Sequence, residues 1–208
     1  MIKQQLRTGD VLDERIISLF ETISRKEFVP SAYQELAYSD MHIPLGHGQS
    51  MLTPLEEGKL LQALQLKGHE TVLEIGTGTG FLTALLSHLS KKVLSIDYYQ
   101  EFTDQARKKL AEHQRDNVEL IVGDGSRGWL DKAPYDVMVF SGAIPVITKT
   151  HRLQIVPGGK LFAIVGKDPI MQGQLHYLDH DDNWHFELVF ETCIPLLIEQ
   201  SKPKEFVF

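Results

Sequence analysis

The stretch that decides the fold is Thr-Val-Leu-Glu-Ile-Gly-Thr-Gly-Thr-Gly-Phe, which occupies residues 71–81. Its first five residues form a short apolar run with β-branched side chains, long enough for a buried strand and too short for a helix. Three glycines follow at two-residue spacing, and the next residues, 82–86, include good helix formers. A strand that turns through glycines into a helix leaves backbone N–H groups free at the carboxyl end of a sheet, where open α/β sheets bind ligands. The stretch therefore predicts a ligand-binding turn.

The glycine spacing separates this turn from two common phosphate-binding motifs. A dinucleotide fingerprint, G-x-G-x-x-G, would need glycine at position 81 or 83, where the chain has Phe81 and Thr83. A Walker motif would need Lys-Ser or Lys-Thr after the glycines, and neither follows. The pattern E-x-G-x-G-x-G instead resembles the first motif of S-adenosylmethionine-dependent methyltransferases; the alternative is an ordinary βα turn without a ligand. The resemblance implies cofactor contacts from Glu74, Gly76, Thr77, Gly78 and Gly80.

Composition limits the class of protein. At 208 residues the chain fits one domain with a full core, or one domain with a small appendage. Its net charge of -7 argues against nucleic acid as the main partner. The single cysteine, Cys193, excludes an internal disulfide and suits a reducing compartment. No signal peptide or membrane-spanning run is apparent, so we expect a cytoplasmic protein.

The first 66 residues show helical patterns and one irregular stretch. Asp13 suits an N-cap, and an apolar face over 16–23 predicts a helix after it. Pro30 should end the helical segment before it, and a weaker helical pattern follows over 33–38. We expect these helices to cover the site or a sheet edge, as a cap. Residues 43–52 show no period and predict an ordered loop, which Thr53, Pro54 and Glu56 convert into a helix through a capping box.

Several motifs together resemble the protein-L-isoaspartate O-methyltransferase family. In chain order they are Lys-Glu-Phe-Val-Pro (26–30), Ile-Pro-Leu-Gly-His-Gly-Gln-Ser (43–50), the glycine motif (74–80), Gly-Asp-Gly (123–125), Pro-Tyr-Asp (134–136), Val-Pro-Gly-Gly-Lys-Leu (156–161) and Ile-Pro-Leu (194–196). The resemblance covers nearly the whole chain, and the stretch at 43–54 is its family-specific part. It implies S-adenosylmethionine as cofactor and isoaspartyl-containing proteins or peptides as substrate. It also implies that residues 194–196 form the last strand.

The remaining strands are expected at 92–97, 118–122, 135–140 and 160–166. The resemblance implies that Asp97, at the end of one strand, accepts both ribose hydroxyls of the cofactor, with Tyr98 beside it. A helix cap or a surface acid is the alternative for Asp97. By the same resemblance Asp124 faces the adenine amino group, and Gly125 lets the backbone approach closely; alone, Asp-Gly would indicate only a turn.

The C-terminal part predicts a hairpin with two strands around a loop at 179–183. His180 and its neighbouring aspartates lack a second histidine or cysteine at ligand spacing, so we expect a solvated loop and no metal site. The tail at 205–208 is apolar, and packing against the body is the simplest expectation.

One position departs from the family pattern. When Gly46, Gly48, Gln49 and Pro54 are aligned, the family's active-site serine falls on Leu52, which cannot donate a hydrogen bond. Ser50 is the candidate catalytic hydroxyl in its place. An acceptor carboxylate is already ionised at neutral pH, so methyl transfer to it needs alignment and exclusion of water rather than a general base.

Together these observations predict a Rossmann-like α/β fold with a doubly wound, mostly parallel sheet and an N-terminal helical cap. Residues 1–66 would form the cap and active-site loop, and residues 67–208 the cofactor-binding core of one compact unit. The leading hypothesis is methyl transfer to L-isoaspartyl carboxylates in damaged proteins, a repair reaction. Two alternatives stay open: a relative with another carboxylate or small-molecule acceptor, and a non-catalytic cofactor-binding scaffold. The oligomeric state is open as well.

Overall fold

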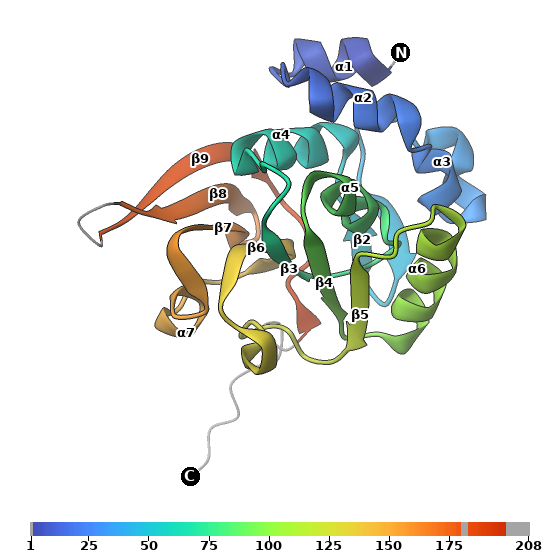
Figure 1. Ribbon diagram of the computed structural model, residues 1–208. Coiled ribbons are helices and arrows are strands. Elements are labelled where there is room, and N and C mark those ends of the chain that lie inside the picture. Colours follow the sequence, from blue (N-terminus) through green and yellow to red (C-terminus); the bar gives the residue numbers. More distant parts are fainter. Residues whose placement is uncertain (1, 180–182, 199–208) are drawn as a thin grey trace.

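A seven-stranded sheet organises the computed structural model, which describes residues 2–179 and 183–198 (Figure 1). Its strand order is β5-β4-β3-β6-β7-β8-β9, and the first five strands in that order run parallel. Strands β8 and β9 are antiparallel additions at one edge. The strands are β3 (Thr71–Ile75), β4 (Lys92–Asp97), β5 (Val118–Val122), β6 (Tyr135–Ile144), β7 (Ile155–Lys167), β8 (Ile170–Leu178) and β9 (Trp184–Thr192). This arrangement confirms the predicted Rossmann-like class.

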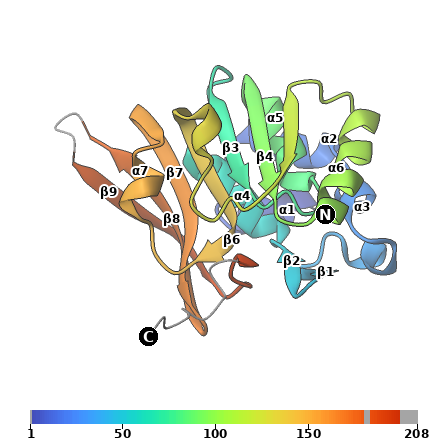
Figure 2. The ribbon, with the colours of Figure 1, turned by 90° about the horizontal axis from the view of Figure 1, so that it is seen from below.

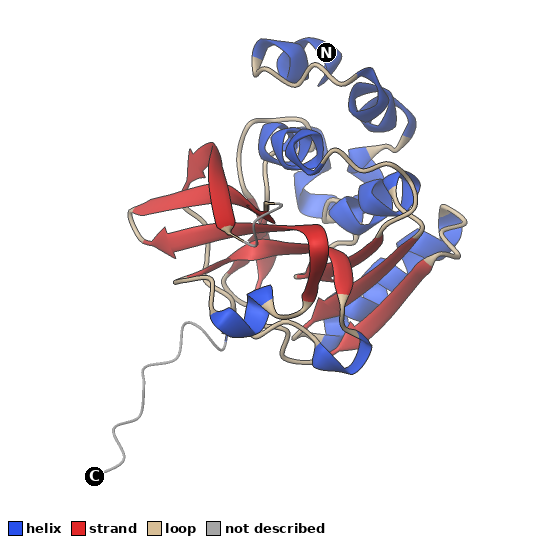
Figure 3. Ribbon diagram, turned by 60° about the vertical axis from the view of Figure 1, so that its left-hand side comes forward, coloured by secondary structure: helices blue, strands red, loops and turns tan. Residues whose placement is uncertain are grey.

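Helices cover the two faces of the sheet unequally. Helices α4 (Pro54–Leu64), α5 (Phe81–Leu89) and α6 (Gln100–Glu112) lie on one face, and the short α7 (Lys149–Arg152) lies on the other (Figures 2 and 3). Alternate strand residues enter two cores because successive side chains of a strand point to opposite faces. Val72 and Val93 belong to the core under α4 and α5, whereas Leu73 and Leu94 belong to the second core.

The N-terminal helices pack on the outer side of the larger helical layer. They are α1 (Ile2–Thr8), α2 (Glu14–Thr22), α3 (Arg25–Phe28) and the 3-10 helix η1 (Ser31–Leu36). α1 and α2 contact α4, and α3 contacts α6 (Figure 1). Gly58 lets α1 approach, since a Cβ there would lie 2.9 Å from Leu6. The cap therefore covers helices rather than the carboxyl edge of the sheet, as part of one continuous core.

Local signals located several boundaries correctly. Asp13 caps α2, its side chain accepting the Arg15 amide, as predicted. The predicted capping box at α4 is also confirmed: Thr53 accepts the Glu56 amide, and the Glu56 carboxylate accepts the Thr53 amide at 2.8 Å. No helix within 2–179 or 183–198 has the length and apolar character needed to cross a membrane.

Other expectations need correction. The predicted loop at 43–52 is a small antiparallel hairpin of β1 (Ile43–Gly46) and β2 (Gln49–Met51). The expected last strand at 194–196 is reduced, among the described residues, to a single bridge between Leu196 and Ala143. Strands β6 and β7 are longer than predicted, and the 33–38 pattern becomes the 3-10 helix η1. The apolar tail at 205–208 and the central loop residues 180–182 lie outside the described residues.

The Glu56 carboxylate joins three distant segments, and its hydrogen bonds shift two pKa values. It accepts a hydrogen bond from His42 at 2.8 Å and one from Thr192 on β9 at 2.5 Å. The hydrogen bond with Glu56 raises the pKa of His42 above its ordinary value of 6.5. Burial alone would raise the pKa of Glu56, but hydrogen bonds from His42, Thr192 and the Thr53 amide outweigh it and lower that pKa below 4.5.

We expect this pair to stabilise the fold most between about pH 4.5 and 6.5. A raised histidine pKa gives stability that is lost as the pH rises through the folded-state pKa, and a lowered glutamate pKa gives stability that is lost on acidification. His42→Gln should lower the melting temperature by about 2–4 °C near pH 6 and by less at pH 9. Melting curves of both proteins across this range measure the difference. An equal deficit at both pH values would contradict the linkage.

Candidate functional site

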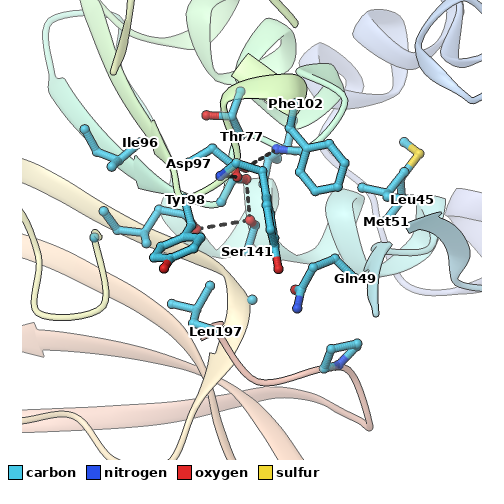
Figure 4. Close-up of a pocket in the computed structure, with 18 of the residues that line it drawn as sticks. Leu45, Gln49, Met51, Thr77, Ile96, Asp97, Tyr98, Phe102, Ser141 and Leu197 are labelled. Carbon is cyan, nitrogen blue, oxygen red and sulfur yellow. Dashed lines mark hydrogen bonds between the residues drawn. The ribbon is translucent and has the colours of Figure 1, made fainter. Parts of the chain in front are cut away.

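A pocket opens at the carboxyl ends of the central parallel strands, where ligands bind in open α/β sheets. Its empty space, with the open solvent at its mouth included, is about 890 Å³. One wall comes from the β3–α5 turn, a second from the segment after β4, and a third from the 123–126 segment after β5. The β1–β2 hairpin, the start of α4, residues 141–142 of β6 and the segment after β9 also contribute to the lining. Figure 4 shows Asp97, Tyr98 and Ser141 close together, with Leu45, Gln49 and Met51 of the hairpin at another side.

The β3–α5 turn needs glycine for two separate reasons. Gly76 has φ +102°, and a Cβ there would lie 2.3 Å from the Ser141 Oγ. The Ser141 hydroxyl occupies that space and donates to the Gly76 carbonyl at 2.6 Å. Gly80 has φ +84°, and its Cβ would lie 2.9 Å from the Cβ of Ala106 on α6. Gly76 therefore shapes the pocket floor, while Gly80 permits the packing of two helices.

Asp97 ends β4 beside this turn and is held by the backbone. Its Oδ2 accepts the Gly78 amide at 2.8 Å, and its Oδ1 accepts the Tyr99 amide at 2.9 Å. Burial raises the pKa of Asp97, and these amides oppose that rise. The carboxylate lines the pocket, so it is placed to accept donors from a ligand. The arrangement suits a pair of hydroxyl groups.

Glu74 points away from the pocket, into the core beneath α5. Its Oε2 accepts the hydroxyls of Thr83 at 2.5 Å and Ser95 at 2.6 Å. Ser95 in turn lies 2.6 Å from the hydroxyl of Thr77, which lines the pocket. Burial raises the pKa of Glu74 to about 8. Glu74 thus reaches the pocket through hydroxyl groups rather than by direct contact.

The segment after β5, residues 123–126, forms the third wall of the pocket. Asp124 lines the pocket, and its Oδ1 accepts the Ser126 amide at 2.9 Å. A Cβ at Gly125 would lie 2.8 Å from Ile75, so only glycine lets this backbone approach the strand ends. The acids at 97 and 124 make this region electronegative, which favours a ligand with positive charge.

The hairpin and the C-terminal segment form the opposite wall, which is mainly apolar. Leu52 is buried there, and Gln49 Nε2 donates to the Leu196 carbonyl at 3.4 Å, joining the hairpin to the C-terminal segment. The Ser50 Oγ is buried without a hydrogen-bond partner among the described residues. An orphaned hydroxyl beside a pocket is available to a ligand, because an unpaired buried polar group is costly.

The hairpin turn is fastened to the start of α6. The His47 ring stacks on Tyr99 with centroids 4.1 Å apart, and its Nε2 lies 3.2 Å from the Glu101 carboxylate. Thr79 of the glycine turn also contacts the Met51 sulfur at 3.8 Å. The hairpin is thereby held over the same pocket that the glycine turn and Asp97 line.

The pocket brings together most of the residues that the sequence singled out. Its lining includes Ser50, Gly76, Thr77, Gly78, Asp97, Tyr98, Asp124 and Gly125. Glu74 and Gly80 lie outside the lining, and the ligand roles of all ten residues stay predictions. Sequence reasoning missed Ser141, Phe102 and the segment 194–198 as pocket residues. Only Ser141 carries a local signal, since it lies near the carboxyl end of the strand next to β3.

The two glycines of the turn should respond differently to alanine. Gly80→Ala combines a left-handed backbone with a clash against Ala106, so we expect a loss of about 2–5 kcal/mol in the free energy of unfolding. Gly78→Ala at φ +51° meets only the flexible end of Leu45, at 3.3 Å, and should cost about 1–2 kcal/mol. Urea denaturation of the two variants compares the costs. Equal losses would mean that packing against α6 does not decide the choice of glycine at position 80.

Comparison with known proteins identifies relatives along nearly the full chain. The family model described as Protein-L-isoaspartate(D-aspartate) O-methyltransferase matches residues 1–194. A protein-L-isoaspartate O-methyltransferase of Methanoculleus marisnigri is 37% identical over 166 residues, which are 80% of this chain and 76% of the relative.

Solved structures agree at the level of the fold. One protein-L-isoaspartate O-methyltransferase has a TM-score of 0.78 at 23% identity; the match covers 94% of this chain and 64% of that one. A Plasmodium falciparum protein, solved in complex with S-adenosyl-L-homocysteine, has a TM-score of 0.77 at 13% identity and covers 94% of this chain and 96% of its own.

The residues of the pocket fit the cofactor that these comparisons indicate. Asp97 offers acceptors for sugar hydroxyls, and Gly76 and Gly78 line the pocket without a side chain that would obstruct a ligand. The acids at 97 and 124 suit the positive charge of a sulfonium. From its family match, its relatives and this fold, the chain belongs to the protein-L-isoaspartate(D-aspartate) O-methyltransferase family, whose cofactor is S-adenosylmethionine.

Proposed function

We propose that this chain transfers a methyl group from S-adenosylmethionine to the carboxylate of L-isoaspartyl residues in damaged proteins and peptides. The observation that carries the proposal is the two-sided pocket, in which Asp97 and the glycine turn face the neutral side chains of the β1–β2 hairpin and of the segment after β9. Glu57 also lines the pocket, and its carboxylate is paired with Arg25. The acidic side suits the cofactor, and the neutral side can receive an acceptor carboxylate without like-charge repulsion. The chain's single cysteine suits work in a reducing compartment such as the cytoplasm.

Each cofactor-side residue has a role in this proposal. When bound, S-adenosylmethionine supplies an electrophilic methyl group. Asp97 would accept hydrogen bonds from the two sugar hydroxyls, and Asp124 would accept one from the amino group of the base. Gly76 and Gly78 would let the backbone lie against the ligand, because both line the pocket and neither has a side chain. Glu74 would act behind them by fixing the hydroxyl of Thr77 through Ser95.

The acceptor side needs no base. A carboxylate is ionised at neutral pH, so the chain has only to orient it and to keep water away. Ser50 would donate its unpaired hydroxyl to one carboxylate oxygen. The hairpin, fastened by His47 to Tyr99, and the 194–198 segment would exclude water. No histidine or lysine lines the pocket in the described part of the chain, which suits an acceptor that does not need deprotonation.

Leu52 supports a second candidate, a family member with a different carboxylate acceptor. The residue is buried in the pocket wall at the position where the family pattern has serine. An apolar side chain there removes one hydrogen-bond donor from an isoaspartyl carboxylate. It also enlarges the apolar surface that a different acceptor could contact.

Radiolabelled cofactor distinguishes these candidates. The purified chain is incubated with an isoaspartyl peptide, a peptide of the same sequence with normal aspartate, and a panel of small carboxylic acids. Methyl groups that base releases from the isoaspartyl peptide alone would support repair methylation. Base-labile methylation of another carboxylate would favour the second candidate. Cofactor binding measured by calorimetry, without transfer to any carboxylate, would identify a scaffold instead and reject both catalytic candidates.

A further inference from the structure

We infer that Arg25 and Glu57 form a positioning pair, which holds the acceptor wall at Leu52 in register with the glycine turn. The inference rests on the proposed function, since it concerns the alignment of the acceptor carboxylate. Neither residue belongs to a motif that the sequence assigns to the cofactor. Both act through the backbone and side chains that they hold.

The contacts of Arg25 reach three separate elements of the pocket. Arg25 begins α3, and its side chain is completely buried. Its Nη1 pairs with the Glu57 carboxylate on α4, and its Nη2 donates to the Leu52 carbonyl at 2.5 Å. Its guanidinium carbon also lies 5.0 Å from the centre of the Phe81 ring. One planar group therefore contacts α4, the end of the hairpin and the start of α5.

These contacts link the two sides of the reaction site. Leu52 follows β2 directly and lies two residues after Ser50, the orphaned hydroxyl on the acceptor side. Phe81 follows Gly80 directly, so it ends the glycine turn on the cofactor side. Glu57 itself lines the pocket. Arg25 thus fixes the separation between the acceptor wall and the cofactor turn, and a misplacement of about 1 Å can slow a reaction about a hundredfold.

Stability alone gives a weak reason for this pair. Moving both charges out of water is costly, and apolar pairs of similar volume often stabilise a protein equally well or better. Burial raises the pKa of Glu57, and the charge of Arg25 opposes that rise. A planar guanidinium can hold a carboxylate and a carbonyl in fixed directions at once, whereas an apolar pair cannot. The ionic pair therefore adds a fixed position of the Leu52 backbone, which an apolar pair would not provide.

The test replaces both charges together, by Arg25→Met with Glu57→Leu. We expect a melting temperature within a few degrees of the wild type, a cofactor dissociation constant within about threefold, and a kcat for the isoaspartyl peptide that falls at least tenfold. Arg25→Lys keeps the charge but not the fork, so its kcat should also fall at least tenfold. The matched control is Arg7→Gln with Glu14→Gln, which removes an exposed ion pair of the same N-terminal helices and should change none of these values.

A second readout does not depend on the acceptor. Amide hydrogen exchange of the segment 49–53 should become at least tenfold faster in the double variant, and the exchange of β4 should stay unchanged. If the wild type does not methylate isoaspartyl peptides, the proposed function fails, and this readout still tests the positioning pair. Wild-type exchange in 49–53, or an unchanged kcat in an active double variant, would overturn the inference. Should the double variant fail to fold, Arg25→Lys and Glu57→Gln are assayed by the same two measurements.

Discussion

Replacing Asp97 with alanine is expected to weaken S-adenosylmethionine binding by about 2–5 kcal/mol, which is roughly 30-fold to several thousandfold in the dissociation constant. The carboxylate accepts the amides of Gly78 and Tyr99 at 2.8 and 2.9 Å, and in our proposal it also accepts two hydroxyls of the cofactor. Alanine would leave these donors without partners in a buried place, where an unpaired polar group costs most. Titration calorimetry with the cofactor or its demethylated product measures the loss.

Two controls make the Asp97 result specific. Asp104→Ala removes an aspartate from the same region, but its side chain accepts a hydrogen bond from Gln100 on the exposed face of α6 and does not line the pocket, so affinity should not change. Asp97→Asn keeps the shape of the side chain but replaces one acceptor oxygen with an NH2 group, which would face a backbone amide donor. We expect this variant to lose affinity for the cofactor as well. Circular dichroism confirms that each variant is folded before titration. A dissociation constant for Asp97→Ala equal to the wild-type value would refute the role assigned to this residue.

The order of elements was predictable because it rests on local signals. The capping box at Thr53, the apolar strand at 71–75 and the glycines after it each act within a few residues of the chain. The hairpin was missed for a physical reason. Its strands have only four and three residues, too few for a period, and they pair with each other rather than with the main sheet. The turn between the two strands has a left-handed backbone at Gly46, His47 and Gly48, and the two glycines are its local sequence signal.

The candidate site was only partly predictable, since much of it depends on long-range contacts. Ser141 and Arg25 bind backbone groups of the site from 65 and 27 residues away along the chain. Glu74 shows the limit of motif reasoning. It lies between Leu73 and Ile75, whose side chains enter the second core, so strand alternation sends Glu74 to the opposite face. Alternation within β3 already indicates that this acid and Ile75 cannot face the same side.

Leu52→Ser is expected to raise kcat/KM for an isoaspartyl peptide by roughly 10- to 100-fold, if the acceptor wall has lost only a hydrogen-bond donor. A hydrogen bond to a charged group contributes about 1.5–3 kcal/mol. If the bond forms to the reacting carboxylate in the transition state, this free energy lowers the barrier and raises kcat/KM. The backbone at this position is already held by Arg25 through the Leu52 carbonyl, so the new hydroxyl would be presented in a fixed direction. Steady-state methylation assays over a range of peptide concentrations provide the measurement.

The substitution also removes a buried apolar side chain, so its two effects must be separated. Leu52 is 4% exposed within the core cluster of the helical layer, and truncating it should cost about 2–4 kcal/mol in the free energy of unfolding. Leu52→Ala shares this packing loss without adding a hydroxyl, so it is the matched control. A gain in Leu52→Ser that Leu52→Ala lacks would assign the effect to the donor. Equal activities in the two variants, with wild-type binding of the cofactor, would mean that the wall at Leu52 fits an acceptor other than the isoaspartyl carboxylate.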